Sequence, residues 1–221
     1  MNDELQMDRR FFGYGRWDAP YWFIGPEQGK GPKETQDNTP RLRAWLQLGE
    51  TELCDCHEFH RLIGEVSWHQ DEPTLQKTWR PLILLLMAYL ERDTRIESLR
   101  TYQRDRWGRV SGGETCIIEL SGLAARSLSV PMARKRFLQE RIEIIRQRID
   151  TYKPELVIMY GDSRERKENW EKIAGDVFPS NKVYPKVLKR GPTVIALFPH
   201  PIWSKLTDLE WKALGEGLSG E

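Results

Sequence analysis

The stretch ELVIMYG, residues 155–161, follows a proline, ends on a glycine and has an uninterrupted apolar interior. A short run rich in Val and Ile is typical of a strand that is buried on both faces of a sheet. Three further runs share this pattern and are also bounded by turn residues: YWFIG (21–25), TCIIEL (115–120) and TVIALF (193–198). Together the four runs predict one mainly parallel sheet.

Helical patterns separate these runs. Residues 132–153 repeat apolar side chains at helical spacing, and shorter patterns of the same kind lie at residues 164–174 and after Thr207. Residues 39–91 contain three more helical patterns. The alternation of strands with helices indicates that helices cross over between parallel strands.

The predicted fold class is α/β: a three-layer α/β/α sandwich around a mainly parallel four-stranded sheet. A chain of 221 residues can bury one substantial core and is short for two domains. We expect a single domain over residues 1–221, in which residues 34–110 form a helical first crossover or an elaboration of the sheet.

Composition limits the cellular setting. The chain has no apolar run near the roughly 18 residues of a membrane span, and its opening residues, MNDELQMDRRFF, lack the apolar region of a secretory signal. Three cysteines are too few for a disulfide framework or for the four ligands of an iron–sulfur cluster. We therefore expect a cytoplasmic protein with reduced thiols and no membrane partner.

Charge is distributed unevenly along the chain, although the formal net charge is only +1. Residues 1–93 carry 11 Lys and Arg against 16 Asp and Glu, whereas residues 126–212 carry 18 against 11. A basic second half favours a polyanion partner such as a nucleic acid. Amphipathic helices with a solvated outer face are the alternative source of the same excess.

Polar segments follow each predicted strand, and parallel sheets bind ligands beyond the carboxyl ends of their strands. In GPEQGKG (25–31), the glycines let backbone amides approach an anion, and Glu27 lies at the edge of the sheet. Glu27 is alternatively a turn carboxylate or a helix cap. A P-loop has four residues between its glycines and a Ser or Thr after its Lys. Here three residues separate Gly25 from Gly29 and Gly31 follows Lys30, so the segment is not a P-loop.

His200 lies between two prolines after the last predicted strand, and these prolines stiffen the loop that holds its imidazole. It is a candidate binding group or, alternatively, a structural histidine. Ser204 and Lys205 follow where the chain enters the last helix, and a hydroxyl, an amide and a cation there can hold a phosphate. An ordinary helix cap is the alternative for Ser204.

In their order and their positions at strand ends, these motifs resemble the uracil-DNA glycosylase superfamily. The chain has a G-x-[DNE] motif after the first predicted strand, a polar residue after the second and an HP motif after the fourth, over roughly residues 20–215. The resemblance implies a three-layer α/β/α fold. It also implies an enzyme that flips a nucleotide out of the stack and hydrolyses its N-glycosidic bond.

The resemblance implies roles for individual residues. Glu27 stands where many members carry the Asp or Asn that positions the attacking water and faces the oxocarbenium charge. His200 stands where the family's histidine donates to O2 of the base and stabilises the departing base anion. Ser204 would then hold a flanking phosphate beside Lys205. Either of two side chains, Trp203 or Leu206, would fill the space vacated by the flipped base.

Two departures from the family pattern concern the substrate. Gln28 stands where many members have Pro, and Glu119 best matches a position that is commonly Asn. An ionised carboxylate cannot donate to O4 of uracil, whereas it suits the N4 amino group of cytosine. We therefore expect Gln28, Gly29, Glu119 and Ser121 to bind a modified cytosine-type base, such as a hypermodified phage base, rather than uracil. A salt bridge to an arginine is the alternative role for Glu119.

The implied function is that of a monofunctional DNA glycosylase, because no lysine stands beside the proposed water site to form a Schiff base. We expect a monomer that binds DNA, uses no cofactor and serves repair or antiviral defence. Two alternatives remain. One is a noncatalytic nucleic-acid-binding protein on the same fold, which Gln28 and Glu119 permit. The other is a nucleotide or small-anion enzyme of another doubly wound family that uses GPEQGKG as a phosphate cradle.

Four residues with metal-binding side chains occur close together: Cys54, Cys56, His57 and His60 form C-D-C-H-x-x-H. The spacing is not that of a standard zinc finger, so we expect ordinary packing and no metal there. The chain also has nine tryptophans. Most are expected in the core, whereas some could stack on bases.

Overall fold

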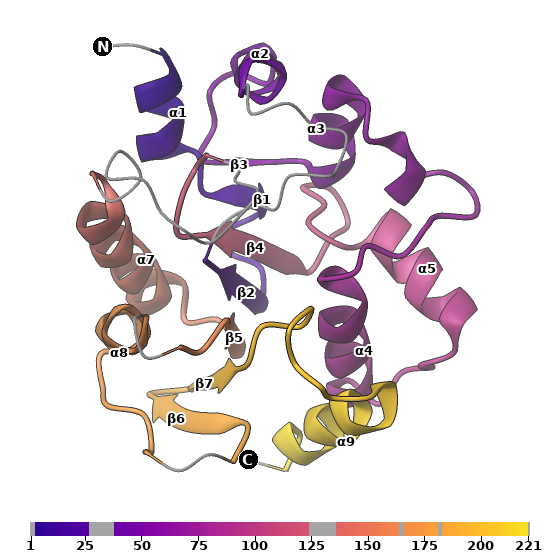
Figure 1. The fold of residues 1–221 in the computed structure, drawn as a ribbon, viewed down its shortest axis with the longest axis vertical. Helices are drawn as coiled ribbons and strands as arrows, with labels where there is room; N and C mark the ends of the chain where they lie inside the picture. Colours follow the sequence, from indigo (N-terminus) through magenta and orange to yellow (C-terminus); the bar gives the residue numbers. More distant parts are fainter. Residues whose placement is uncertain (1–2, 27–37, 124–135, 164–165, 181–182, 221) are drawn as a thin grey trace.

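The computed structural model describes residues 3–26, 38–123, 136–163, 166–180 and 183–220. Within them, strands form one mixed sheet in the order β3-β1-β4-β2-β5-β7-β6 (Figure 1). The strands are β1 (Gly13–Gly15), β2 (Tyr21–Gly25), β3 (Leu53–Cys54), β4 (Thr115–Glu119), β5 (Leu156–Tyr160), β6 (Lys186–Arg190) and β7 (Thr193–Phe198).

The four apolar runs of the sequence are the central strands β4, β2, β5 and β7, and each of them is parallel to its neighbour in this group. The prediction of a four-stranded sheet is wrong in number, because the described part of the sheet has seven strands. The three additional strands lie at the edges. β1 pairs antiparallel with β4 and parallel with β3, and β6 forms an antiparallel hairpin with β7.

The edge strands lack the sequence pattern of a buried strand. β1 reads GYG and β3 has two residues, so neither makes a recognisable apolar run. β6 reads KVLKR and is half-buried, as an edge strand with charged side chains is. β3 lies within residues 34–110, so this segment contributes a strand as well as helices.

Helices cover both faces of the sheet (Figure 1). α7 (Leu138–Tyr152) and α8 (Lys167–Ala174) pack on one face. α4 (Trp79–Tyr89), α5 (Ile96–Asp105) and α9 (Asp208–Leu218) contribute to the core on the other face. The remaining helices lie towards the β3 edge: α1 (Asp3–Arg10), α2 (Thr39–Gln47), α3 (Cys56–Ile63) and the short 3-10 helix η1 (Val66–Trp68).

The central strands alternate strictly between the two cores. Leu156, Ile158 and Tyr160 of β5 belong to the core under α4 and α9, whereas Val157 and Met159 belong to the core under α7 and α8. This alternation follows from the two-residue period of a strand. Side chains two residues apart on one strand therefore share a face, which decides what the strand ends present.

Local signals explain where several helices begin and end. Thr207 and Glu210 form a reciprocal capping box that starts α9, which confirms the expected beginning of the last helix. α3 begins after Asp55, whose carboxylate accepts from the first backbone amides, and it stops at Gly64 in a left-handed conformation. None of the helices in the described residues has the length and apolar character needed to cross a bilayer.

Candidate functional site

The central strands reverse their order at β2. From β2 the chain crosses to β4 on one side, and from β4 it crosses to β5 on the other side of β2. In open α/β sheets such a reversal opens a crevice at the carboxyl ends of the strands, and ligands bind there. The topology therefore places the candidate site where β2 and β5 end.

The last residues of β4, β2, β5 and β7 face the same side. Gly25 pairs with Glu119 in register, and Tyr160 pairs with Phe198. On each strand, the residue two positions earlier packs into the core beneath α4 and α9, so the last residue points to that same face. Because Gly25 has no side chain, its neighbours on either side can approach each other across β2.

Tyr160 and Glu119 make this approach. The Tyr160 hydroxyl donates to Oε1 of Glu119 at 3.4 Å, and both side chains are buried. A Cβ on Gly25 would lie 2.2 Å from that hydroxyl and 2.6 Å from Oε2 of Glu119. Burial, together with the adjacent carboxylate, raises the pKa of Tyr160 well above its usual value. The hydroxyl therefore stays protonated and serves as a donor.

Arg141 supports this arrangement from α7. Its buried guanidinium donates to the backbone oxygens of Glu119 at 2.7 Å and Leu120 at 2.9 Å, and to those of Asp8 and Arg9 at 2.9 and 3.2 Å. One side chain thus ties the carboxyl end of β4 to the last turn of α1. Arg141 therefore bonds to the backbone oxygen of Glu119. The side-chain carboxylate of Glu119 accepts a hydrogen bond from Tyr160.

His200 lies beside this pair in the loop after β7. Its ring meets the ring of Tyr160 edge to face with 5.7 Å between centroids. A Cβ on Gly161, at the end of β5, would lie 3.5 Å from Pro26 and 3.8 Å from Cδ2 of His200. The loops that follow β2, β5 and β7 therefore meet at one point, as the sequence predicts.

The surroundings of His200 decide its protonation. Burial and the charge of Arg166 lower the pKa of His200 to about 4, so the imidazole is neutral near pH 7. The backbone amide of Ile202 donates to its Nδ1 at 3.3 Å. Because Nδ1 is an acceptor, the ring proton is on Nε2. His200 therefore presents one N–H donor and no charge.

Trp203 is the most accessible aromatic group of the site. Its ring stacks on His200 at 4.4 Å between centroids, and 60% of the residue remains exposed. Lys205 is also exposed. Leu206 is half-buried and packs against the core, so of the two candidates for the space of a flipped base, Trp203 is the one that reaches solvent.

Two further predicted residues have structural partners. The Ser204 hydroxyl donates to the backbone oxygen of Pro201 at 3.1 Å, and Thr207, not Ser204, caps the last helix. The buried Ser121 hydroxyl lies 3.3 Å from Oδ1 of Asp8 and accepts from the Leu123 amide at 3.2 Å. Ser121 therefore connects β4 to α1. Three other predicted site residues, Glu27, Gln28 and Gly29, lie outside the described residues, directly after Pro26.

Several polar groups of the site are not evident from sequence motifs. Asp162, just beyond β5, pairs with Lys186 at 2.6 Å and accepts from the Tyr184 hydroxyl at 2.9 Å. Arg166 donates to the backbone oxygen of Gly161 at 3.2 Å. Of these groups, only Asp162 had a signal, because it follows a predicted strand directly. Lys186 and Tyr184 are brought to it by an edge strand and the segment before it.

The comparisons with known proteins add no identity: no protein-family model matches the chain, and no curated protein is found to be similar to it.

Proposed function

We propose that the protein is a monofunctional DNA glycosylase that hydrolyses the N-glycosidic bond of a flipped, modified cytosine-type base. The observation that carries the proposal is the state of His200 at the switch point. A neutral imidazole with its proton on Nε2 lies there between the exposed Trp203 and Tyr160, whose hydroxyl bonds the buried carboxylate of Glu119. Such a donor can stabilise a carbonyl oxygen on which negative charge develops as a base departs.

His200 suits this role because its donor is preorganised. The Ile202 amide fixes the tautomer, Trp203 stacks on the ring and Tyr160 meets it edge to face. A neutral donor also does not transfer its proton prematurely to the leaving group. The sequence places Glu27 one residue beyond Pro26, so its carboxylate is the proposed group that orients water toward the sugar carbon.

Glu119 and Tyr160 supply the proposed base recognition. A carboxylate accepts hydrogen bonds from an exocyclic amino group, whereas the Tyr160 hydroxyl is already directed at Glu119. This combination favours a base with an amino group over uracil, which offers a carbonyl oxygen at the same edge.

The exposed side of the site suits a DNA strand. Trp203 offers an aromatic face for stacking on a base, and Lys205 offers a cation to a phosphate. Residues 126–212 carry the basic excess of the chain, and three of these cations lie on the edge strand β6. A single extruded nucleotide could therefore be held between a stacked aromatic ring and a charged backbone contact.

Base release from a mixture of DNAs tests the proposal. The mixture contains uracil, hypoxanthine, methylated cytosine, hydroxymethylcytosine and glucosylated hydroxymethylcytosine, and free bases are identified by mass spectrometry. We expect release of one amino-bearing base by the native chain and its loss in Glu27→Ala, with DNA binding retained. Binding of DNA without release of any base would instead favour a noncatalytic nucleic-acid-binding protein.

A further inference from the structure

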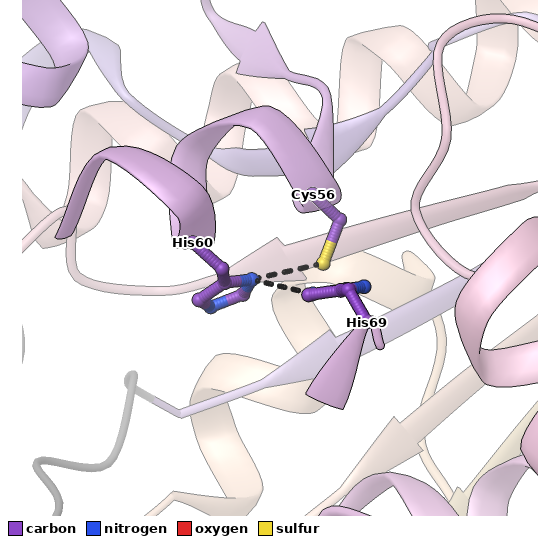
Figure 2. A group of neighbouring side chains, drawn as sticks. All are labelled: Cys56, His60 and His69. Atoms are coloured by element: carbon purple, nitrogen blue, oxygen red, sulfur yellow. Dashed lines mark hydrogen bonds between the residues drawn. The ribbon is translucent and has the colours of Figure 1, made fainter. Parts of the chain in front are cut away.

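A second group of polar side chains lies outside the candidate site, in the core beneath the helices at the β3 edge. Cys56 and His60 are one turn apart on α3, and His69 directly follows η1 (Figure 2). Nδ1 of His60 lies 3.4 Å from Sγ of Cys56 and 3.2 Å from Nε2 of His69. The three potential ligand atoms lie within 4.8 Å of one another, and the residues are 0%, 2% and 5% exposed.

The two separations that involve His60 fit a tetrahedral metal site. Zinc binds imidazole nitrogen at about 2.0–2.1 Å and thiolate sulfur at about 2.3 Å. In a tetrahedron with those bond lengths, two nitrogens are about 3.3–3.4 Å apart and a sulfur and a nitrogen about 3.6 Å apart. The observed 3.2 and 3.4 Å lie within about 0.2 Å of these two edges, so an ion could sit between the atoms after a small adjustment.

Hydrogen bonding alone satisfies the group poorly. Nδ1 of His60 is the common partner of both Cys56 and His69. Burying three polar side chains for two shared contacts is costly, whereas a bound cation uses a lone pair on each.

The electrostatic setting favours a metal ligand set. Cys56 is the first residue of α3, where the helix dipole favours a thiolate. A dipositive ion would supply the remaining stabilisation.

The neighbours of the group hold it in place and separate it from bulk solvent. The rings of Trp68 and Trp79 meet His60 at 5.0 and 5.5 Å between centroids. His57 stacks on His69 at 5.1 Å but its Nδ1 lies 3.0 Å from Arg109, so it supports the group without joining it. Cys54 contacts Thr51 at 3.4 Å instead.

We propose that Cys56, His60 and His69 bind one zinc ion that fastens α3 to the turn after η1. The C-D-C-H-x-x-H segment thus contributes two ligands rather than four, and the third comes from a histidine nine residues beyond His60. Three protein ligands leave a fourth position for water or another small ligand. Because the group is buried, the ion stabilises the helical cover of the sheet rather than meeting a macromolecular substrate.

Metal analysis of the purified native chain tests this site without any assay of activity. We expect one zinc per chain, and a cobalt-loaded form with tetrahedral visible bands and a thiolate charge-transfer band. Removal of the metal should lower Tm. Cys56→Ser and His69→Ala should weaken cobalt binding at least tenfold, whereas Cys54→Ser and His57→Asn, the matched controls, should bind as the native chain does.

X-ray absorption of the zinc-loaded native chain keeps the test decisive if a ligand variant does not fold. The proposed site predicts one sulfur and two imidazole nitrogens in the first coordination shell. A first shell without sulfur, a native chain that binds neither zinc nor cobalt, or a Cys56→Ser variant with an unchanged charge-transfer band would each overturn the proposal.

Discussion

The hydroxyl of Tyr160 meets the carboxylate of Glu119 across Gly25, so three adjacent parallel strands each place their last residue in one contact. The contact exists because the middle strand ends on the residue that lacks a side chain. It lies at the reversal of strand order, where an open α/β sheet binds its ligand.

Gly25→Ala should disrupt the site. An added Cβ would lie 2.2 Å from the Tyr160 hydroxyl, and the buried tyrosine ring has little room to move. We expect a loss of about 1–3 kcal/mol in the free energy of unfolding and a large loss of base release. Denaturant unfolding and the release assay measure the two effects.

Gly217→Ala is the matched control for this substitution. Gly217 lies in α9, and a Cβ there would meet open space. Alanine should leave base release unchanged and raise stability by up to about 1 kcal/mol, because it is the better helix former. Equal behaviour of the two alanine variants would show that the strand ends are not closely packed.

Glu119→Gln should change which base is released. The amide replaces one acceptor oxygen by an NH₂ donor, so it can bond a carbonyl at the edge of the base. We expect release of the amino-bearing base to fall by about tenfold or more and release of uracil to rise relative to it. Competition between the two substrates in one reaction gives the ratio directly, and an unchanged ratio would remove Glu119 from base recognition.

The low pKa of His200 predicts a pH dependence of stability. In the unfolded chain a histidine has a pKa of about 6.5, whereas His200 in the folded protein has a pKa of about 4. As the pH falls below about 6.5, the unfolded state binds the proton first, so stability declines until the pH reaches about 4. His200→Asn should lose less stability between about pH 7 and pH 5 than the native chain. An equal or larger loss in the variant, measured by urea unfolding, would contradict the assigned environment.

Arg141→Met should be strongly destabilising. The substitution leaves four backbone oxygens without their buried donor and removes a cation near Asp8 and Glu119. We expect a loss of about 3–5 kcal/mol in the free energy of unfolding. Arg146→Met, at an exposed position of the same helix, should change it by no more than about 0.5 kcal/mol. Similar unfolding midpoints for the two variants would show that Arg141 does not hold β4 to α1.

Sequence alone was sufficient for the central sheet. Its four strands are apolar along their whole length because helices cover both faces, and such runs stand out from the helical segments between them. The same pattern could not identify β1, β3 and β6. Two of these strands are two or three residues long, and the third keeps charged side chains at an edge.

The candidate site could be predicted in position but only partly in composition. His200 and Glu119 follow or end predicted strands, so their presence at the same edge of the sheet was foreseeable. Tyr160 lies within an apolar run and therefore had no signal of its own. Its hydroxyl becomes relevant only through its hydrogen bond to Glu119. Arg141 had a weak signal, since it is a charged residue on the buried stripe of an amphipathic helix.

No local sequence motif indicated a role for His69. Its ring joins Cys56 and His60 only because the chain turns back after α3 through η1. The segment C-D-C-H-x-x-H contains four potential ligands that are close in the chain, and two of them, Cys56 and His60, lie in the group. The third member, His69, is identified by its position in the folded structure and not by its spacing in the sequence.

The most direct measurement is the single-turnover rate of base release from DNA that carries the preferred base, with the native chain and His200→Ala compared at equal occupancy. We expect the native chain to release free base, and loss of the Nε2–H donor to slow release by about 10²–10³-fold with little change in DNA affinity. Release at the same rate by both proteins, or no release by either, would contradict the assignment of this site to N-glycosidic bond cleavage.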